Sequence, residues 1–194
     1  MSDIDTFQAT IAMLDGVDST TPAFKKFVAD LLSRVDPFRP FGTELFNAIV
    51  RVSTGIAFEA VLFRVENGVV EVFLRRRSLD DTAYPGEWHA PGSFFRPREK
   101  NHDVAERLQS EFGAKLSQYN LVNSAPLPDD ERCSGLSQIF LVQLDGFPRL
   151  DDWHGWFSVE NLPENTIHSH RDIVIPLALS AFSQHLKSLE EVDF

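Results

Sequence analysis

The sequence predicts an α/β fold of the mixed α+β type: an α/β/α sandwich built on a central mixed sheet and preceded by a helical extension. Three observations carry this prediction: a hairpin pattern at residues 57–75, an amphipathic helical window at 103–112, and a long helical segment near the C-terminus. Strand and helix patterns in this order are expected to place helices on the faces of one sheet. With 194 residues, 43% hydrophobic, the chain can bury one substantial core.

Residues 1 to about 52 have helical periodicity. Thr21-Pro22 resembles a helix cap followed by proline at the first helical position. Pro37 and Pro40 interrupt the pattern, and residues 44–52 are expected to form a further short helix. We therefore divide the chain into an N-terminal helical extension, residues 1–54, and a second domain, residues 55–194. Two apolar faces define the helices of the extension, the first made of Phe7, Ile11 and Leu14 and the second of Phe24, Phe27, Val28, Leu31 and Leu32.

The apolar stripe of the second helix has two readings. It either forms the contact of a homodimer or packs against the rest of the same chain, and the sequence leaves both open.

The second domain opens with the hairpin. Residues 57–65 and 69–75 are predicted to pair as antiparallel strands around the turn at Asn67-Gly68. A loop follows, and residues 103–112 then form a helix that ends at Gly113. Strands are predicted near residues 119–122 and at 138–144, and the last helix at residues 169–189.

Charge and composition exclude several classes of protein. The net charge is −11, and Arg75-Arg76-Arg77 is the single cationic run, so binding to nucleic acid is disfavoured, whereas one nucleotide needs only a local cationic pocket. One cysteine rules out an intrachain disulfide. The first residues lack the features of a secretory signal, and no apolar stretch is long enough to span a bilayer. We expect a cytoplasmic protein with no membrane partner.

One stretch carries a family resemblance. Residues 92–114 resemble the Nudix box, Gx5Ex7REUxEExGU, in which U is aliphatic: Gly92, Leu108, Glu111 and Gly113 match, and Ala114 matches weakly. Residues 88–92 and 156–163 also resemble family segments. The resemblance spans residues 55–187 and implies a Nudix-like sandwich.

The box departs from the pattern where the family binds metal. Arg98 replaces the first glutamate, Glu106-Arg107 inverts the Arg-Glu pair, and Ser110 replaces the first glutamate of the last pair. Carboxylates at i, i+3 and i+4 share one helix face and can hold divalent cations against a pyrophosphate. That face here carries Arg107, Ser110 and Glu111.

The resemblance implies a divergent hydrolase that cleaves a nucleoside-diphosphate-linked or related pyrophosphate with Mg²⁺ or Mn²⁺, weakly because the box is degraded. Glu111 and Glu106 are the candidate catalytic residues, and Glu111, Glu106 and Asp103 are the candidate metal ligands. The alternative is a catalytically inactive Nudix-fold protein that binds a ligand or serves in regulation.

Candidate substrate-binding residues surround the box. Arg75 and Arg77 could hold a phosphate or could simply be solvated at a strand end, where alternation should turn one of the three arginines away from its neighbours. Trp88 and Gly92 belong to the entry of the box, where Trp88 could contact the ligand or pack the loop. Three histidines, His154, His168 and His170, are considered as a zinc site, although no cysteine or HExxH pattern accompanies them.

Overall fold

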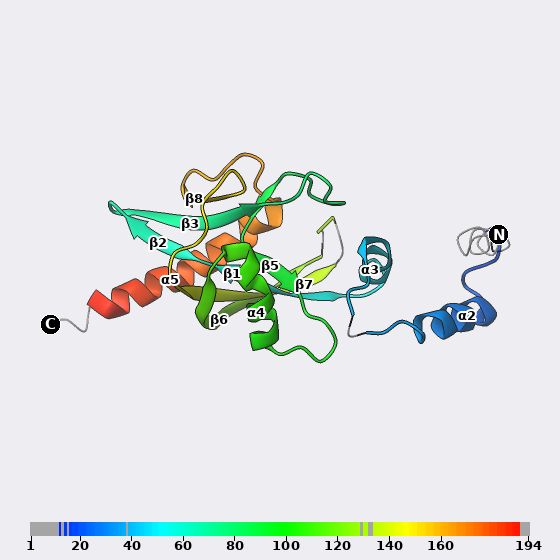
Figure 1. The fold of residues 1–194 in the computed structure, drawn as a ribbon. Coiled ribbons are helices and arrows are strands. Elements are labelled where there is room, and N and C mark those ends of the chain that lie inside the picture. The colour runs from blue at the N-terminus through cyan, green and yellow to red at the C-terminus, as the bar shows by residue number, and fades with distance from the viewer. Residues whose placement is uncertain are drawn as a thin grey trace. The chain divides into compact units, whose positions relative to one another are not determined.

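The computed structural model describes residues 12, 14, 16–37, 39–128, 130–131 and 134–190. The chain divides into two compact units, Met1–Pro40 and Phe41–Phe194 (Figure 1). Within the described part of the chain, no helix combines the length and apolar character needed to cross a membrane.

The first unit contains helix α2, Pro22–Leu32. Thr21 caps it as predicted, because its Oγ accepts a hydrogen bond from the Phe24 amide at 3.2 Å. None of the residues of α2 is buried, and Phe27, Leu31 and Leu32 of its apolar stripe are exposed. The predicted face of Phe7 and Ile11 lies outside the described residues.

Helix α3, Thr43–Val50, belongs to the second compact unit. It is the further short helix expected from the sequence. Its Phe46 ring lies 5.5 Å from the Phe94 ring, and its Asn47 amide donates to Thr82 at 3.1 Å. The compact units thus divide at Pro40, whereas the division drawn from the sequence lies after residue 54.

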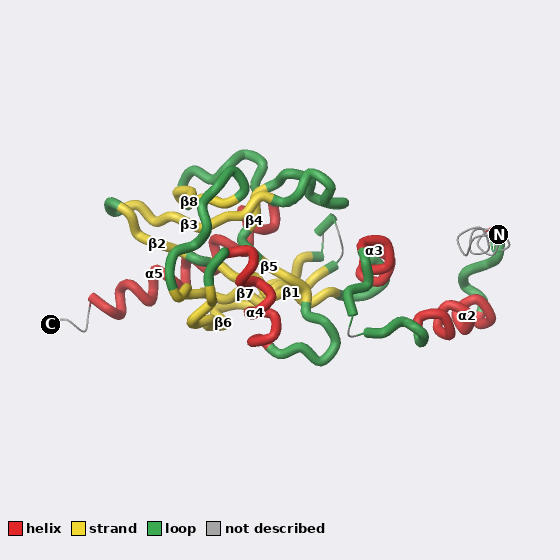
Figure 2. Tube along the Cα trace, viewed as in Figure 1, coloured by secondary structure: helices red, strands yellow, loops and turns green. Residues whose placement is uncertain are grey.

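Two four-stranded sheets form the centre of the second unit (Figure 2). The first has the order β5-β1-β7-β6, and β1 runs parallel to β7 but antiparallel to β5, so this sheet is mixed as predicted. In the second sheet, β3 pairs with β2, β4 and β8. The strands of the first sheet are β1 Gly55–Val61, β5 Gly92–Phe94, β6 Lys115–Leu127 and β7 Gly135–Asp145, and those of the second are β2 Phe63–Glu66, β3 Val69–Arg76, β4 Trp88–His89 and β8 His154–Ser158.

The predicted hairpin is correct only for the last part of its first strand. Residues 63–66 pair with 69–72 around Asn67 and Gly68, whose φ angles are 51° and 80°. Residues 55–61 instead lie in the other sheet, so the prediction that residues 57–61 pair with β3 is wrong. The reason is that β1 is buried and already hydrogen-bonded on both edges, to β5 and to β7.

Helix α4, Asn101–Phe112, carries the box and confirms the predicted helical window. Gly113 ends it with a φ of 71°, a left-handed conformation that suits glycine. Alternate residues from the middle of β1 to the start of β2 face opposite layers. Phe58, Ala60 and Leu62 pack against the buried face of α4, whereas Val61 and Phe63 pack toward the last helix.

The last helix, α5, spans Ile175–Glu190 and follows a π-helical turn at His170–Val174. The two elements together confirm the predicted C-terminal helix. Helices α4 and α5 thus belong to separate apolar layers around the sheets, which is the predicted α/β/α arrangement. The predicted strands at 119–122 and 138–144 are the central parts of β6 and β7.

Candidate functional site

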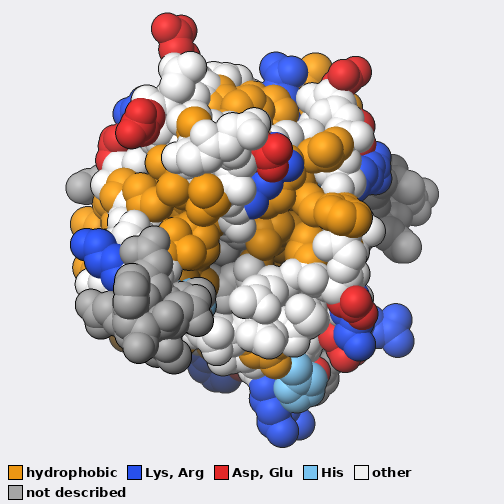
Figure 3. Space-filling model, turned by 90° about the vertical axis from the view of Figure 1, so that its left-hand side faces the viewer, with side chains coloured by type: hydrophobic (Ala, Val, Ile, Leu, Met, Phe, Trp, Pro, Cys, Tyr) orange, Lys and Arg blue, Asp and Glu red, His pale blue; other side chains and the backbone are white. Residues whose placement is uncertain are grey.

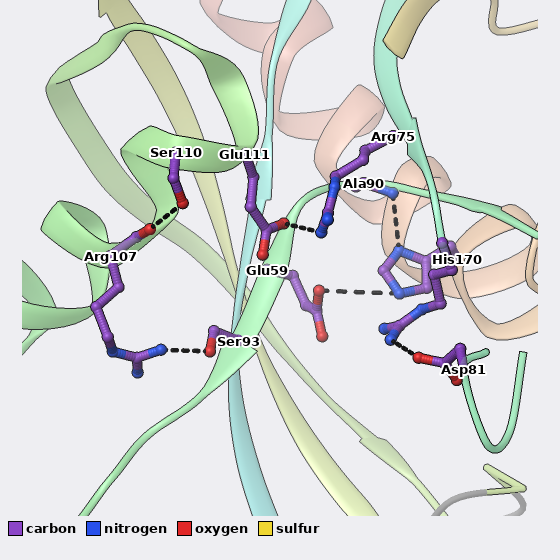
Figure 4. A network of polar contacts seen from close by, with 10 residues as sticks. Glu59, Arg75, Asp81, Ala90, Ser93, Arg107, Ser110, Glu111 and His170 are labelled. Atoms are coloured by element: carbon purple, nitrogen blue, oxygen red, sulfur yellow. Dashed lines mark hydrogen bonds and ion pairs between the residues drawn. The ribbon is translucent and has the colours of Figure 1, made fainter. Parts of the chain in front are cut away.

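Three consecutive arginines at the end of β3 point to two different sides. Arg76 Nε donates to the Gly86 carbonyl at 2.8 Å, and its guanidinium carbon lies 5.7 Å from the centre of the Trp153 ring. Arg75 points toward a cluster of polar side chains from β1, α4 and the π-helical turn (Figure 4). The charge of Arg77 acts on Glu59 and Glu111 of the same cluster. The expected strand alternation is confirmed, and two guanidinium groups reach the same cluster.

Glu111, in the last turn of α4, faces this cluster. Its Oε2 lies 3.3 Å from Arg75 Nη1, and the two side chains are 20% and 35% exposed. The same oxygen is buried and has no partner in hydrogen-bond geometry among the described residues. Burial raises the pKa of Glu111 above its ordinary value, although the charges of Arg75 and Arg77 oppose that rise. The surviving box glutamate is therefore held by an arginine.

Glu59, in the middle of β1, is a member of the cluster that the sequence analysis missed. Its carboxylate accepts a hydrogen bond from Ser137 Oγ at 3.4 Å, and its Oε2 lies 3.8 Å from His170 Nε2. Burial raises the pKa of Glu59 to about 7, against the lowering effect of the Arg77 charge. The sequence does contain a sign of this role: Glu59 is a single carboxylate inside the otherwise apolar run Ala57–Leu62. Charged side chains are rarely buried without a function or a partner.

Gly92 lies directly against Glu59. A β-carbon added at residue 92 would overlap the Glu59 carboxylate and would approach the Phe58 carbonyl oxygen to 3.1 Å. The first glycine of the box is thus required here so that β5 can pass close to a buried carboxylate on β1.

Two buried histidines border the cluster, and both are neutral. His170 Nδ1 accepts a hydrogen bond from the Ala90 amide at 3.3 Å, which leaves the proton on Nε2, toward Glu59. Burial lowers the pKa of His170 to about 3 and the pKa of His89 well below its usual range. Neither ring nitrogen of His89 has a hydrogen-bond partner among the described residues.

Arg77 closes the cluster on the side of the loop that follows β3. Its Nη1 donates to Asp81 at 3.0 Å, and its Nε is buried without a hydrogen-bond partner in the described part of the chain. A cavity of about 50 Å³ lies beside it, between β1, the start of β7 and the π-helical turn. Since one water needs about 10–15 Å³, the cavity has room for a few waters or one small polar group. Its polar lining consists of Glu59, Arg77, Tyr84, Asp130, Ser137 and His170.

Comparison with known proteins identifies this architecture. No family model and no curated protein matches the chain. Solved structures do: a mutT/nudix family protein from Listeria innocua superposes with a TM-score of 0.54 at 21% identity, over 68% of this chain and 96% of that one. The chain has the Nudix fold. The Nudix domain of Shewanella oneidensis NrtR, solved with ADP ribose, matches with a TM-score of 0.51 at 17% identity, over 79% of this chain and 97% of that domain. The C-terminal domain of mouse MUTYH, solved with human PCNA, has a TM-score of 0.54 at 16% identity, over 68% and 91% of the two chains.

Within this Nudix fold, Arg107 fastens the box helix to the loop before it. Its Nε and Nη2 donate to the two carboxylate oxygens of Glu99 at 2.9 and 2.8 Å. Its Nη1 donates to Ser93 Oγ at 2.6 Å, and its Nη2 also donates to the Phe94 carbonyl at 3.0 Å. Glu99 and Arg107 each lie one residue beyond the positions where the box pattern has glutamate and arginine. Both partners of this ion pair are therefore displaced by one residue relative to the pattern, and Arg107 has a structural role.

The three predicted metal ligands do not come together. Asp103 accepts a hydrogen bond from the Lys100 amide at 2.7 Å in the first turn of α4. It lies about 12 Å along the helix axis from Glu111, at 1.5 Å per residue. Glu106 is exposed and lies about 140° around the helix from Glu111.

A divalent metal does not fit the arrangement of these side chains. Among the residues that the structure describes, no three His, Cys, Asp or Glu side chains converge on one point. Arg75 occupies the space beside Glu111, and Arg107, at a metal-ligand position of the pattern, is engaged elsewhere. Divalent ions of this kind prefer several anionic oxygens, which this face does not present.

The remaining candidates have structural contacts. The Trp88 ring packs edge-on against Phe157 at 4.8 Å, the packing alternative of the sequence analysis. His154 bonds to Asp151 at 2.6 Å, His168 is exposed, and His170 is buried beside Glu59, so the three histidines hold no common ion.

Proposed function

We propose that this protein binds a nucleoside-diphosphate-linked or related pyrophosphate compound, and that Arg75 and Arg77 neutralise its charge in place of a divalent metal. The observation that carries the proposal is the pairing of Arg75 with Glu111. A built-in cation stands beside the box glutamate, where the family pattern calls for a metal site.

The chemistry of the two arginines suits a phosphate. A guanidinium group presents donors in a planar fork that matches phosphate oxygens, and partial burial strengthens such bonds. Arg77 also has a buried Nε without a hydrogen-bond partner in the described residues, which a ligand oxygen would satisfy. The cavity beside Arg77, about 50 Å³, admits only a small polar end of the ligand, so the rest of the molecule would lie outside it.

The bound anion would change the protonation of Glu111. Its pKa is already raised by burial, and a phosphate beside it would raise the pKa further while drawing Arg75 away. Binding is therefore expected to be accompanied by proton uptake, which calorimetry in buffers of different ionisation enthalpy measures.

The test uses the full chain and calorimetric titration with ADP-ribose, the compound bound in the Shewanella structure, in buffer containing EDTA. We expect binding that EDTA does not weaken. Arg75→Met and Arg77→Met should each lower affinity roughly tenfold or more, as expected when one charge-assisted contact is lost. Arg76→Met is the matched control, because Arg76 points away from the cluster. A strict need for Mg²⁺, or equal losses in all three variants, would contradict the proposal.

A second candidate function is slow hydrolysis of the same class of compound, and one observation favours it. Glu59 has a pKa of about 7 and lines the cavity, which suits a group that accepts a proton from water. Under this candidate, turnover of ADP-ribose should be weak and should disappear in Glu59→Gln. Robust Mg²⁺- or Mn²⁺-dependent turnover that survives both Glu59→Gln and Glu111→Gln would place the catalytic acids elsewhere.

A further inference from the structure

A second, larger cavity lies farther along β7 than the polar cluster. The polar cavity is lined by Ser137 near the start of β7, and the second cavity by residues 141–144. Four residues of strand, from Ser137 to Leu141, span about 13 Å. No residue lines both cavities. The second cavity is therefore separate from the site proposed to bind phosphate.

The second cavity has the size and lining of a small-molecule site. Its volume is about 580 Å³, within the usual 300–1,000 Å³ of such pockets. Figure 3 shows hydrophobic side chains gathered over the middle of the molecular face that lies at the left of Figure 1. Phe147, at the edge of the cavity, is 93% exposed, so a ligand there would cover apolar surface that now contacts water. The apolar lining includes Leu62, Phe63, Val122, Leu141, Trp156 and Phe182.

Several aromatic rings form part of this lining. Phe63 on β2 stacks with Phe182 on α5 at 5.1 Å, and Trp156 on β8 lies under the Arg64 guanidinium at 4.6 Å. Flat rings favour offset or edge contacts with another flat ring, which adds to the free energy gained from apolar burial alone. The walls thus favour a planar aromatic ligand over a branched aliphatic one.

The arginine that lines the cavity is already paired. Arg64 Nη2 lies 2.6 Å from Glu71, and Arg64 Nη1 lies 4.0 Å from Glu66. An anionic ligand would lose hydration there without meeting an unpaired arginine, and burying an unpaired charge is costly. The other polar side chains of the lining, Asn120, Gln143 and His185, can hydrogen-bond with an uncharged ligand.

We propose that this cavity binds an uncharged, planar aromatic small molecule at a site independent of the polar cluster. The polar side chains orient its edge, and the apolar contacts supply most of the affinity.

The test titrates the full chain with prodan, an uncharged naphthalene dye whose emission moves to the blue in apolar surroundings. We expect saturable binding with a blue shift, and weaker binding of anilinonaphthalene sulfonate, a comparable dye that carries a negative charge. Ala181→Trp, on α5, fills the cavity and should weaken prodan binding roughly tenfold or more. Ser180→Trp is the matched control, since residue 180 is exposed on the same helix and does not line the cavity.

A second variant keeps the test decisive if Ala181→Trp does not fold. Gln143→Trp fills the cavity from an exposed position on β7 and should have the same effect. Absence of saturable prodan binding, equal affinity in a folded filling variant, or tighter binding of the sulfonate would overturn the proposal. Arg75→Met with Arg77→Met should leave prodan binding unchanged, so failure here and failure of the phosphate proposal are distinguishable.

Discussion

The hydrogen bonds and ion pair of Arg107 allow a direct test of what holds helix α4 against the loop before it. Arg107→Met removes the four hydrogen bonds to Glu99, Ser93 and Phe94 but keeps the apolar stem of the side chain. Breaking a buried ion pair costs about 3–5 kcal/mol, whereas an exposed pair contributes about 0–1 kcal/mol. The Arg107 and Glu99 side chains are 26% and 15% exposed, between these limits. We therefore expect the free energy of unfolding to fall by roughly 2–3 kcal/mol.

Urea denaturation followed by circular dichroism measures this change. In a thermal scan it corresponds to a decrease in Tm of roughly 4–12 °C, at about 2–4 °C per kcal/mol for a domain of this size. Glu106→Gln, at an exposed position next to Arg107, is the control and should change stability by less than about 0.5 kcal/mol. Equal stabilities of the two variants would refute the view that Arg107 is structural.

The pH dependence gives a second check on the same pair. Burial raises the pKa of Glu99, but the hydrogen bond and charge of Arg107 outweigh it, and the pKa lies below its ordinary 4.5. A carboxyl group with a lowered folded pKa stabilises the protein above its unfolded pKa, and that contribution is lost as pH falls through the folded value. The difference between the parent chain and Arg107→Met should be complete at neutral pH and should shrink below pH 4.5.

Three further predictions concern the cluster and the box. Burial raises the pKa of Glu59 from 4.5 to about 7, so the free energy of unfolding should fall as pH rises through this window, by about 3.5 kcal/mol at 1.4 kcal/mol per pKa unit. Glu59→Gln should remove that pH dependence in urea melts. Gly92→Ala should destabilise the chain because the added methyl group overlaps the Glu59 carboxylate, and thermal scans should show partial rescue in the double variant with Glu59→Ala. Arg107→Glu with Ser110→Glu restores the three carboxylates that the family pattern has on this helix face, and it should be less stable than Arg107→Met because a carboxylate then faces Glu99. Mn²⁺ calorimetry on the same protein tests whether metal affinity rises, and stability equal to that of Arg107→Met would show that Glu99 has turned away.

Local patterns in the sequence were sufficient for the elements that depend on neighbouring residues. The spacing of Val104, Leu108 and Phe112 fixed the buried face of α4, and Gly113 fixed its end. Asn67 and Gly68 fixed a turn because both adopt positive φ angles. The first strand of that hairpin was predicted as continuous because β1 and β2 are separated only by Leu62, and periodicity carries no information on which sheet each part joins.

The candidate site was predictable only in part. The alternation that brings Arg75 and Arg77 to one side follows from strand geometry, and the resemblance to the box selected Glu111 and Gly92. Glu106 and Asp103 were chosen for their closeness in sequence, but the helix carries them away from Glu111. Glu59 and His170 lie more than a hundred residues apart in the chain, and only the packing of β1 against the π-helical turn brings them together.

By itself, the sequence determined the type of fold, the extent of the helix at 101–112 and the absence of most carboxylates that the family pattern has on one face of that helix, because each depends on residue identity and local spacing. The tertiary structure decided which ion pairs form around this helix face. Arg107 pairs with Glu99 from the preceding loop, and Arg75 from β3 pairs with Glu111. The pKa of Glu59 was also decided there, since it depends on how much water the surrounding layers exclude and on which charges they bring near. Such long-range electrostatic effects arise from contacts between distant segments, which local sequence patterns do not encode.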